Sequence, residues 1–77
     1  METQIIRLIG VAFNKDLSGF EIADCTPEKI EGWDSLGFLN LIMLLEEEFK
    51  VSFGLEDIAE MSVGGEELQK IIKKAAG

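Results

Sequence analysis

The sequence predicts an all-α protein, a small four-helix bundle with three main helices, one short helix and a long loop between the first two helices. Apolar residues recur at spacings of three and four over three separate stretches, and no stretch alternates apolar and polar residues as a strand does. The chain of 77 residues has one proline and neither an internal repeat nor a low-complexity tract. We therefore expect a single domain that spans residues 1–77.

The first helix is expected over Glu2–Lys15, where Ile5, Ile9 and Phe13 recur at every fourth position. Residues 16–33 follow no sustained period and mix charged residues and glycines with isolated apolar residues. Loops longer than about 12–15 residues are uncommon in compact domains and often serve function. This loop is therefore expected either to be pinned to the core by its apolar side chains or to lead to a functional site. Those side chains are Leu17, Phe20, Ile22 and Ile30.

The second helix is predicted to run from Ser35 to Lys50, because Asp34-Ser35 precedes an apolar, helix-forming stretch and can cap its first turn. One row of side chains on this helix is expected to face the core, and it comprises Phe38, Leu41, Ile42, Leu45 and Phe49. A second row, at spacings of four, three and four residues, comprises Leu36, Asn40, Met43 and Glu47. Only the first row requires a core to explain it.

Two further helical segments follow. Gly54 breaks the pattern, and Leu55–Met61 is expected to form a short helix or a turn of one, with Leu55 and Ile58 facing inward. The last helix is predicted over about Glu66–Ala75, with acidic residues in its first turn and lysines in its last turns, which suits the helix dipole. Its apolar face comprises Leu68, Ile71, Ile72 and Ala75.

The charge balance limits the possible partners. The formal net charge is −8, and most of the acidic residues lie in residues 16–67, which argues against nucleic acid or an anionic membrane surface and favours basic partners. The longest apolar run, Leu41–Leu45, is far shorter than the roughly 20 residues that span a bilayer, so no membrane insertion is expected. The N-terminal residues lack the pattern of a secretory signal, and we expect a cytoplasmic protein.

The composition gives little support to catalysis or metal binding. The chain has no histidine, and Cys25 is its only cysteine, so imidazole bases, an internal disulfide and a thiol cluster for zinc are missing. Acid clusters such as Glu46–Glu48 lack the spaced oxygen ligands and the glycine of a calcium loop. We expect no specific metal site, no enzyme activity, and no role for Cys25, whose acidic neighbours disfavour the thiolate.

The segment Gly32–Gly37 places a serine where a long loop meets the start of a helix. Asp34 and Ser35 there have two interpretations. They can simply cap the helix, which is the common role of such a pair. Alternatively, a phosphate esterified to Ser35 would be stabilised by the unpaired amides and the partial positive charge of the helix N-terminus. Capping geometry does not separate the two.

Three segments of the sequence resemble acyl carrier proteins. They are Asp34-Ser35-Leu36, the helix from Leu39 that ends in Leu-Leu-Glu-Glu-Glu-Phe49, and Glu56-Asp57-Ile58 followed by Ser62-Val63. The resemblance covers essentially the whole chain, including the helix order, the long first loop and the acidic middle. It implies that Ser35, between Asp34 and Leu36, is the attachment point of 4′-phosphopantetheine, which a phosphopantetheinyl transferase delivers from coenzyme A. The thiol of that arm would carry an acyl or aminoacyl group as a thioester. The resemblance thus implies a monomeric carrier and no catalyst, in agreement with the absence of histidine.

Carriers of this family are recognised through the second helix and the loop before it. The matching positions here are Leu36, Asn40, Met43, Glu46 and Glu47, with Glu56 and Asp57 on the short helix. An apolar centre with an acidic rim would speed encounter with acyl-loading and acyl-transferring enzymes that have basic docking patches. Each glutamate alone is also explained by a solvated helix face, and Met43 by a place in the core.

Two positions depart from carriers of the fatty-acid-synthesis type. Those carriers usually have an acidic residue directly after the triplet and another three positions on, where this chain has Gly37 and Asn40. The difference favours a specialised pathway, with this chain as a discrete carrier for a modified fatty acid, a polyketide, an aminoacyl group or a cell-surface polysaccharide. The resemblance also implies that a long acyl chain would be sheltered between the helices. The residues that would line this space are equally well explained as ordinary core residues. They are Phe38, Ile42, Leu45, Phe49, Ile58 and Ile72.

Two alternatives stay open. Trp33 is either a hydrophobic anchor that folds the loop back over the second helix or an exposed contact for a partner, and the burial free energy of its large ring favours the anchor. The whole chain is alternatively an acidic helical adaptor that binds one protein through Leu36 and Met43 and carries no prosthetic group. Ser35 would then be only a cap.

Overall fold

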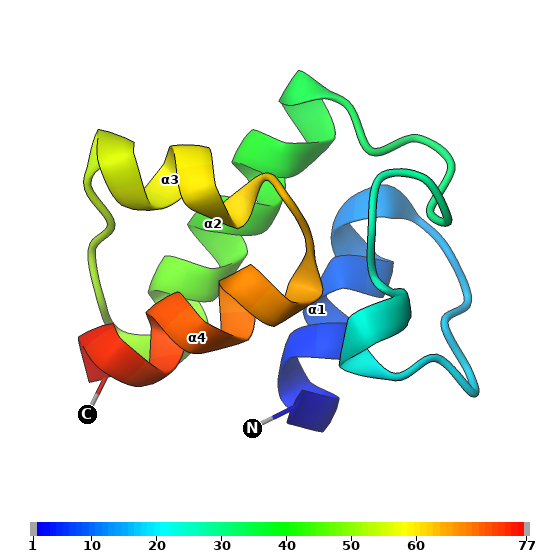
Figure 1. Ribbon diagram of the computed structural model, residues 1–77, viewed down its shortest axis with the longest axis horizontal. Coiled ribbons are helices and arrows are strands. Elements are labelled where there is room, and N and C mark those ends of the chain that lie inside the picture. The colour runs from blue at the N-terminus through cyan, green and yellow to red at the C-terminus, as the bar shows by residue number, and fades with distance from the viewer. Residues whose placement is uncertain (1, 77) are drawn as a thin grey trace.

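The computed structural model describes residues 2–76 (Figure 1). All of its secondary structure over that range is helical, which confirms the predicted all-α class. Met1 and Gly77, which the predicted domain includes, lie outside the described residues. The short 3-10 helix η1 lies within the segment expected to be a loop and was not predicted. In chain order the elements are α1 (Glu2–Phe13), η1 (Ile22–Asp24), α2 (Ser35–Phe49), α3 (Leu55–Met61) and α4 (Gly65–Ala76).

Helices α1 and α2 pack side by side and run in opposite directions. In the first half of α1, Arg7 Nη2 and Gln4 Nε2 lie 3.9 Å and 3.4 Å from Glu48 Oε2, near the end of α2. At the other end of the pair, the ring of Phe13 lies against the backbone of Gly37. Helices α3 and α4 also run in opposite directions and are joined by a short turn, with α3 crossing α2 in the view of Figure 1.

Helix α1 ends two residues before the predicted boundary at Lys15, because Asn14 adopts a left-handed backbone conformation with a φ of 56°. The amide of Lys15 donates to the carbonyl of Gly10 at 2.9 Å, and the amide of Asn14 donates to the carbonyl of Val11 at 3.3 Å. This hydrogen-bond pattern is a Schellman motif, which satisfies the last carbonyls of a helix and turns the chain away from its axis. It directs residues 14–34 back across the core.

A single core joins all the helices, and the predicted inward row of α2 belongs to it. Four residues of that row are buried and Phe49 is half-buried. The buried apolar residues are Ile5, Leu8, Ile9, Phe13, Ile22, Cys25, Ile30, Phe38, Leu41, Ile42, Leu45, Phe53, Met61, Leu68, Ile71 and Ile72. Phe53 was not predicted to belong to the core.

Two predictions of inward-facing residues are wrong. Leu55 is 87% exposed, because α3 buries Met61 and places Ile58 at the edge of the core. At about 100° per residue, a spacing of six residues puts Leu55 about 120° around the helix from Met61. Ala75 is exposed as well, because α4 extends beyond the core after Ile72.

The long segment between α1 and α2 is pinned to the core, which is the first of the two alternatives for it. Ile22, Cys25 and Ile30 are buried, and the segment contacts the start of α4 closely. The amide of Gly65 donates to the carbonyl of Cys25 at 2.6 Å, and a Cβ at Gly65 would lie 2.6 Å from the carbonyl oxygen of Ile22. Only glycine allows this approach. Burial, with Asp24 nearby, raises the pKa of the Cys25 thiol to about 11.

Candidate functional site

The junction between the long segment and α2 separates the roles of Asp34 and Ser35. Asp34 is the N-cap residue, with an extended backbone, and its Oδ1 accepts a hydrogen bond from the amide of Gly37 at 2.8 Å. Ser35 occupies the first helical position and its side chain is exposed. Among the described residues, no group forms a hydrogen bond with the Ser35 hydroxyl. The cap therefore belongs to Asp34, and the hydroxyl of Ser35 is open to chemistry.

Directly before this junction, Trp33 stacks with two phenylalanine rings. Its ring centroid lies 5.0 Å from that of Phe13 on α1, at an interplanar angle of 20°. It lies 6.3 Å from the centroid of Phe38 on α2, at 18°. Trp33 is half-buried, so of the two interpretations the packing supports the anchor.

The second row of α2 is exposed along its length. Leu36 and Met43 are 81% and 65% exposed, and Asn40 and Glu47 are also exposed. The adjacent Leu39, which was not predicted to contribute, is 52% exposed. At about 100° per residue, Leu36, Asn40, Met43 and Glu47 fall within about 60° of one another around the helix. Because Met43 lies on this face and not in the core, the row forms a continuous apolar and acidic surface.

Two of the residues predicted to recognise partners make hydrogen bonds within the chain. Glu46 is half-buried, and its Oε2 accepts a hydrogen bond from the amide of Phe53 at 2.9 Å, which holds the connection between α2 and α3. Asp57 is half-buried, and its Oδ2 accepts from the amide of Gly54 at 3.4 Å, at the start of α3. Glu56 is exposed beside it. Glu46 and Asp57 thus have a structural role whatever they contact outside the chain.

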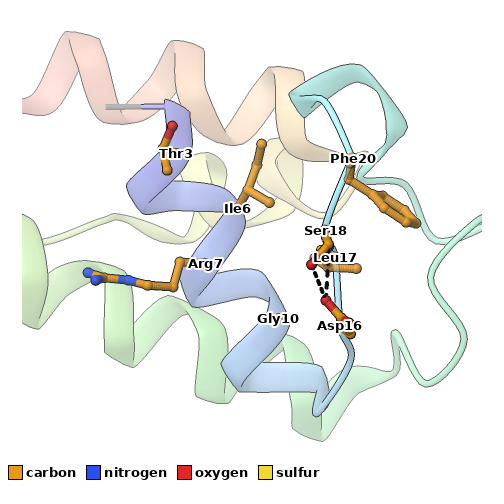
Figure 2. A pocket seen from close by; sticks show the side chains of 9 residues that line it. Thr3, Ile6, Arg7, Gly10, Asp16, Leu17, Ser18 and Phe20 are labelled. Atoms are coloured by element: carbon orange, nitrogen blue, oxygen red, sulfur yellow. Dashed lines mark hydrogen bonds between the residues drawn. The ribbon is translucent and has the colours of Figure 1, made fainter.

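A hollow on the surface lies away from the Ser35 junction. It has a volume of about 450 Å³ and lies between α1 and residues 16–20 (Figure 2). Ile6, Leu17 and Phe20 line it, and the side chain of Arg7 points away from the loop residues in this view. Asp16 Oδ1 accepts hydrogen bonds from Ser18 Oγ at 2.6 Å and Ser18 N at 3.0 Å, which lower the pKa of the Asp16 carboxyl. Apolar side chains therefore line the hollow, beside a loop turn whose hydrogen bonds join Asp16 and Ser18.

The residues predicted to line an acyl-chain cavity form no part of this hollow, nor of the second one, of about 100 Å³, between η1 and the start of α4. Phe38, Ile42, Leu45 and Ile72 are buried in the core, and Phe49 and Ile58 pack half-buried against it. In the structure these residues fill the space between the helices.

Comparisons with protein-family models, curated proteins and solved structures found no match for this chain. Within residues 2–76, no group of three or more His, Cys, Asp or Glu side chains is placed to hold a metal ion. No helix of that range is long and apolar enough to cross a membrane. The features of the molecule that bear on function are the geometry around Ser35 and the exposed face of α2.

The contact between Phe13 and Gly37, two residues after Ser35, was not predicted from the sequence. A Cβ at Gly37 would lie 2.6 Å and 2.8 Å from two carbons of the Phe13 ring. The signal for such a contact was present, because a glycine in the first turn of a helix costs stability and commonly has a packing reason. The identity of the neighbouring side chain was not available from spacing alone.

Proposed function

We propose that this protein is an acyl carrier that bears 4′-phosphopantetheine on Ser35 and presents acyl or aminoacyl thioesters to biosynthetic enzymes. The observation that carries the proposal is the division of roles at the start of α2. Asp34 alone makes the side-chain cap, while the Ser35 hydroxyl is exposed at the first helical position. A serine that is not needed for capping can be esterified without loss of the helix N-terminus.

The local electrostatics favour a phosphodiester at this position. The Gly37 amide is already bound by the Asp34 side chain, so the partial positive charge of the helix N-terminus and the first-turn amides that Asp34 does not occupy would stabilise an anionic group there. In the proposed modification the Ser35 oxygen attacks the phosphorus of coenzyme A that bears the pantetheine. The phosphoanhydride bond breaks, 3′,5′-ADP leaves, and a base on the transferring enzyme accepts the hydroxyl proton. The carrier supplies the nucleophile and its position, and the chemistry occurs on partner enzymes.

The exposed face of α2 supports the proposed class of partner. Leu36, Leu39 and Met43 give an apolar centre, and Glu47 lies on the same face. A phosphopantetheinyl transferase and acyl-loading enzymes with basic docking patches would complement this face. The protein would act as a cytoplasmic monomer. Its pathway would be a specialised one, because Gly37 and Asn40 stand where carriers of fatty acid synthesis usually have acidic residues.

Intact-mass measurement tests the proposal directly. The protein and its Ser35→Ala variant are incubated with coenzyme A and a broad-specificity phosphopantetheinyl transferase, with an established carrier modified in parallel. Ser52→Ala, at an exposed serine in the loop after α2, is the matched control. One added phosphopantetheine on the parent and on Ser52→Ala, with none on Ser35→Ala, is the expected result. An unmodified parent beside a modified control carrier would refute the proposal.

A second candidate function is an acidic helical adaptor that binds one protein and has no prosthetic group. The observation that favours it is the exposed apolar row of Leu36, Leu39 and Met43, which would serve a permanent partner equally well. The two functions differ in their dependence on Ser35. An adaptor keeps its binding when Ser35 is replaced by Thr, whereas a carrier loses its modification site for an enzyme that requires the serine hydroxyl.

A further inference from the structure

We infer that Trp33 is the positioning residue of the Asp34–Ser35 junction, fixing the Ser35 hydroxyl for its modification through the stack of Phe13, Trp33 and Phe38. The inference rests on the proposed function in so far as it concerns modification of Ser35. On this inference, the position of the loop before α2 depends on one side chain, the indole of Trp33.

Trp33 is the only side chain between Ile30 and Phe38 that packs on the core. Ile30 is 2% exposed and Phe38 is 8% exposed. Between them, residues 31, 32 and 34–36 are exposed, and residue 37 is a glycine. The chain therefore has one anchor over the stretch that contains the N-cap and the candidate serine.

The backbone turns sharply at Gly32 and Trp33 and is extended at Asp34. Gly32 has a φ of 91°, a conformation that favours glycine, and the amide of Asp34 donates to the carbonyl of Gly32 at 2.8 Å. This i to i+2 hydrogen bond makes Trp33 the central residue of a three-residue turn. When the indole is held in place, the turn fixes where Asp34 and Ser35 enter the helix.

The stack that holds the indole reaches both long helices. Phe13 is the last residue of α1 and lies 5.0 Å from Trp33 between ring centroids. The Phe13 ring also occupies the space in which a side chain at position 37 would lie. The absence of a side chain at Gly37 thus lets one aromatic cluster contact α1, the loop and the first turn of α2 together.

Loss of the Trp33 indole should change the rate of phosphopantetheine transfer more than it changes binding of the transferase. A nucleophile misplaced by about 1 Å can lose about a hundredfold in rate. Removal of the indole would leave the Asp34 cap able to form but would widen the range of positions of the Ser35 hydroxyl. The Asp34–Gly37 hydrogen bond would then open more often.

The test compares the parent with Trp33→Ala, Trp33→Phe and the control Phe20→Ala, which removes a half-buried aromatic ring from the same long segment. Rates of phosphopantetheine transfer are measured as a function of carrier concentration, well below the melting transition of each variant. We expect Trp33→Ala to lose about tenfold or more in kcat/KM, mainly in kcat. Trp33→Phe, which restores a ring to the stack, should stay within about threefold of the parent, as should Phe20→Ala.

A second measurement needs no modification. The hydrogen-exchange rates of the Gly37 and Phe38 amides, whose N–H groups donate to Asp34, are each divided by the exchange rate of the Leu45 amide in the same helix. The result is a ratio of exchange rates for each variant. Trp33→Ala should raise this ratio about tenfold or more, and Phe20→Ala should leave it unchanged.

Transfer to Trp33→Ala at the parental kcat/KM would overturn the inference, as would an equal loss in Phe20→Ala. A parent that is not modified at all refutes the proposed function instead. In that case the exchange ratio decides whether Trp33 positions the junction: an unchanged ratio in Trp33→Ala overturns this inference too.

Discussion

Replacement of Gly37 by alanine should destabilise the protein, although the same change in most helices stabilises. Alanine is favoured over glycine in a helix interior by about 1 kcal/mol. At Gly37 the added Cβ would lie 2.6 Å and 2.8 Å from two carbons of the Phe13 ring. Carbon atoms in contact prefer about 3.5–4.0 Å, so the ring or the helix must move.

The size of the effect follows from how little freedom the Phe13 ring has. Phe13 is 8% exposed and stacks on Trp33, so it cannot rotate into solvent. Overpacking of a core typically costs about 1–3 kcal/mol. Contacts this short place Gly37→Ala in the upper part of that range, about 2–3 kcal/mol. After subtraction of the gain of about 1 kcal/mol in helix propensity, we expect the free energy of unfolding to fall by about 1–2 kcal/mol. For a domain of this size that corresponds to a fall in Tm of about 4–16 °C.

A double-mutant cycle isolates the contact. Urea unfolding, followed by circular dichroism, is measured for the parent, Gly37→Ala, Phe13→Leu and the double variant. In the Phe13→Leu background, which lacks the ring, Gly37→Ala should be neutral or stabilising by up to about 1 kcal/mol. A Gly37→Ala variant as stable as the parent, or an equal loss in both backgrounds, would show that the ring does not restrict position 37.

Three other predictions concern the cap, the acidic surface and the buried thiol. Asp34→Ala should lower the free energy of unfolding by about 1 kcal/mol, because it removes the bond to the Gly37 amide. Ser35→Ala should stay within about 0.5 kcal/mol of the parent, and urea titrations of both variants check the difference. Added NaCl or MgCl₂ should raise Tm, because a net charge of −8 repels itself at low ionic strength; a Tm that is flat or falls with salt contradicts this. The Cys25 thiol has its pKa raised from 9.0 to about 11, so the folded state holds that proton more tightly than the unfolded state. Its contribution to stability should be complete below about pH 9 and lost toward pH 11, and thermal melts of Cys25→Ala should lack this component.

The four α-helices could be predicted from the sequence because their signals are local. Apolar spacing located α1, α2 and α4, and the glycine before Leu55 located α3. The boundary of α1 was missed because it depends on a left-handed Asn14, and local pattern does not distinguish that from one more helical residue. The inward face of α3 was assigned correctly for Ile58 and wrongly for Leu55, because a seven-residue helix contains too few residues to fix a face from spacing alone.

The candidate site was predictable only in part, because its decisive contacts join residues far apart in the chain. The pair Asp34-Ser35 identified the start of α2, but spacing could not say which of the two is the cap. The hydrogen bond from the Phe53 amide to Glu46 joins residues in different elements, and the contact of Phe13 with Gly37 joins two helices. Both contacts depend on tertiary packing, which no local pattern contains.

The exposed face of α2 shows why a helix that is apolar around most of its circumference need not be buried all round. The core takes Leu41, Ile42 and Leu45, while Leu36 and Met43 remain mostly in water. Full burial of such a side chain contributes about 1.5–3 kcal/mol, so a chain of this size forgoes a considerable gain in stability on this face. Adjacent exposed apolar residues with acidic neighbours are typical of a surface that another protein covers for part of the time. An adaptor and a carrier both use such a surface, but only a carrier needs it to end beside a serine whose hydroxyl is left without a structural role.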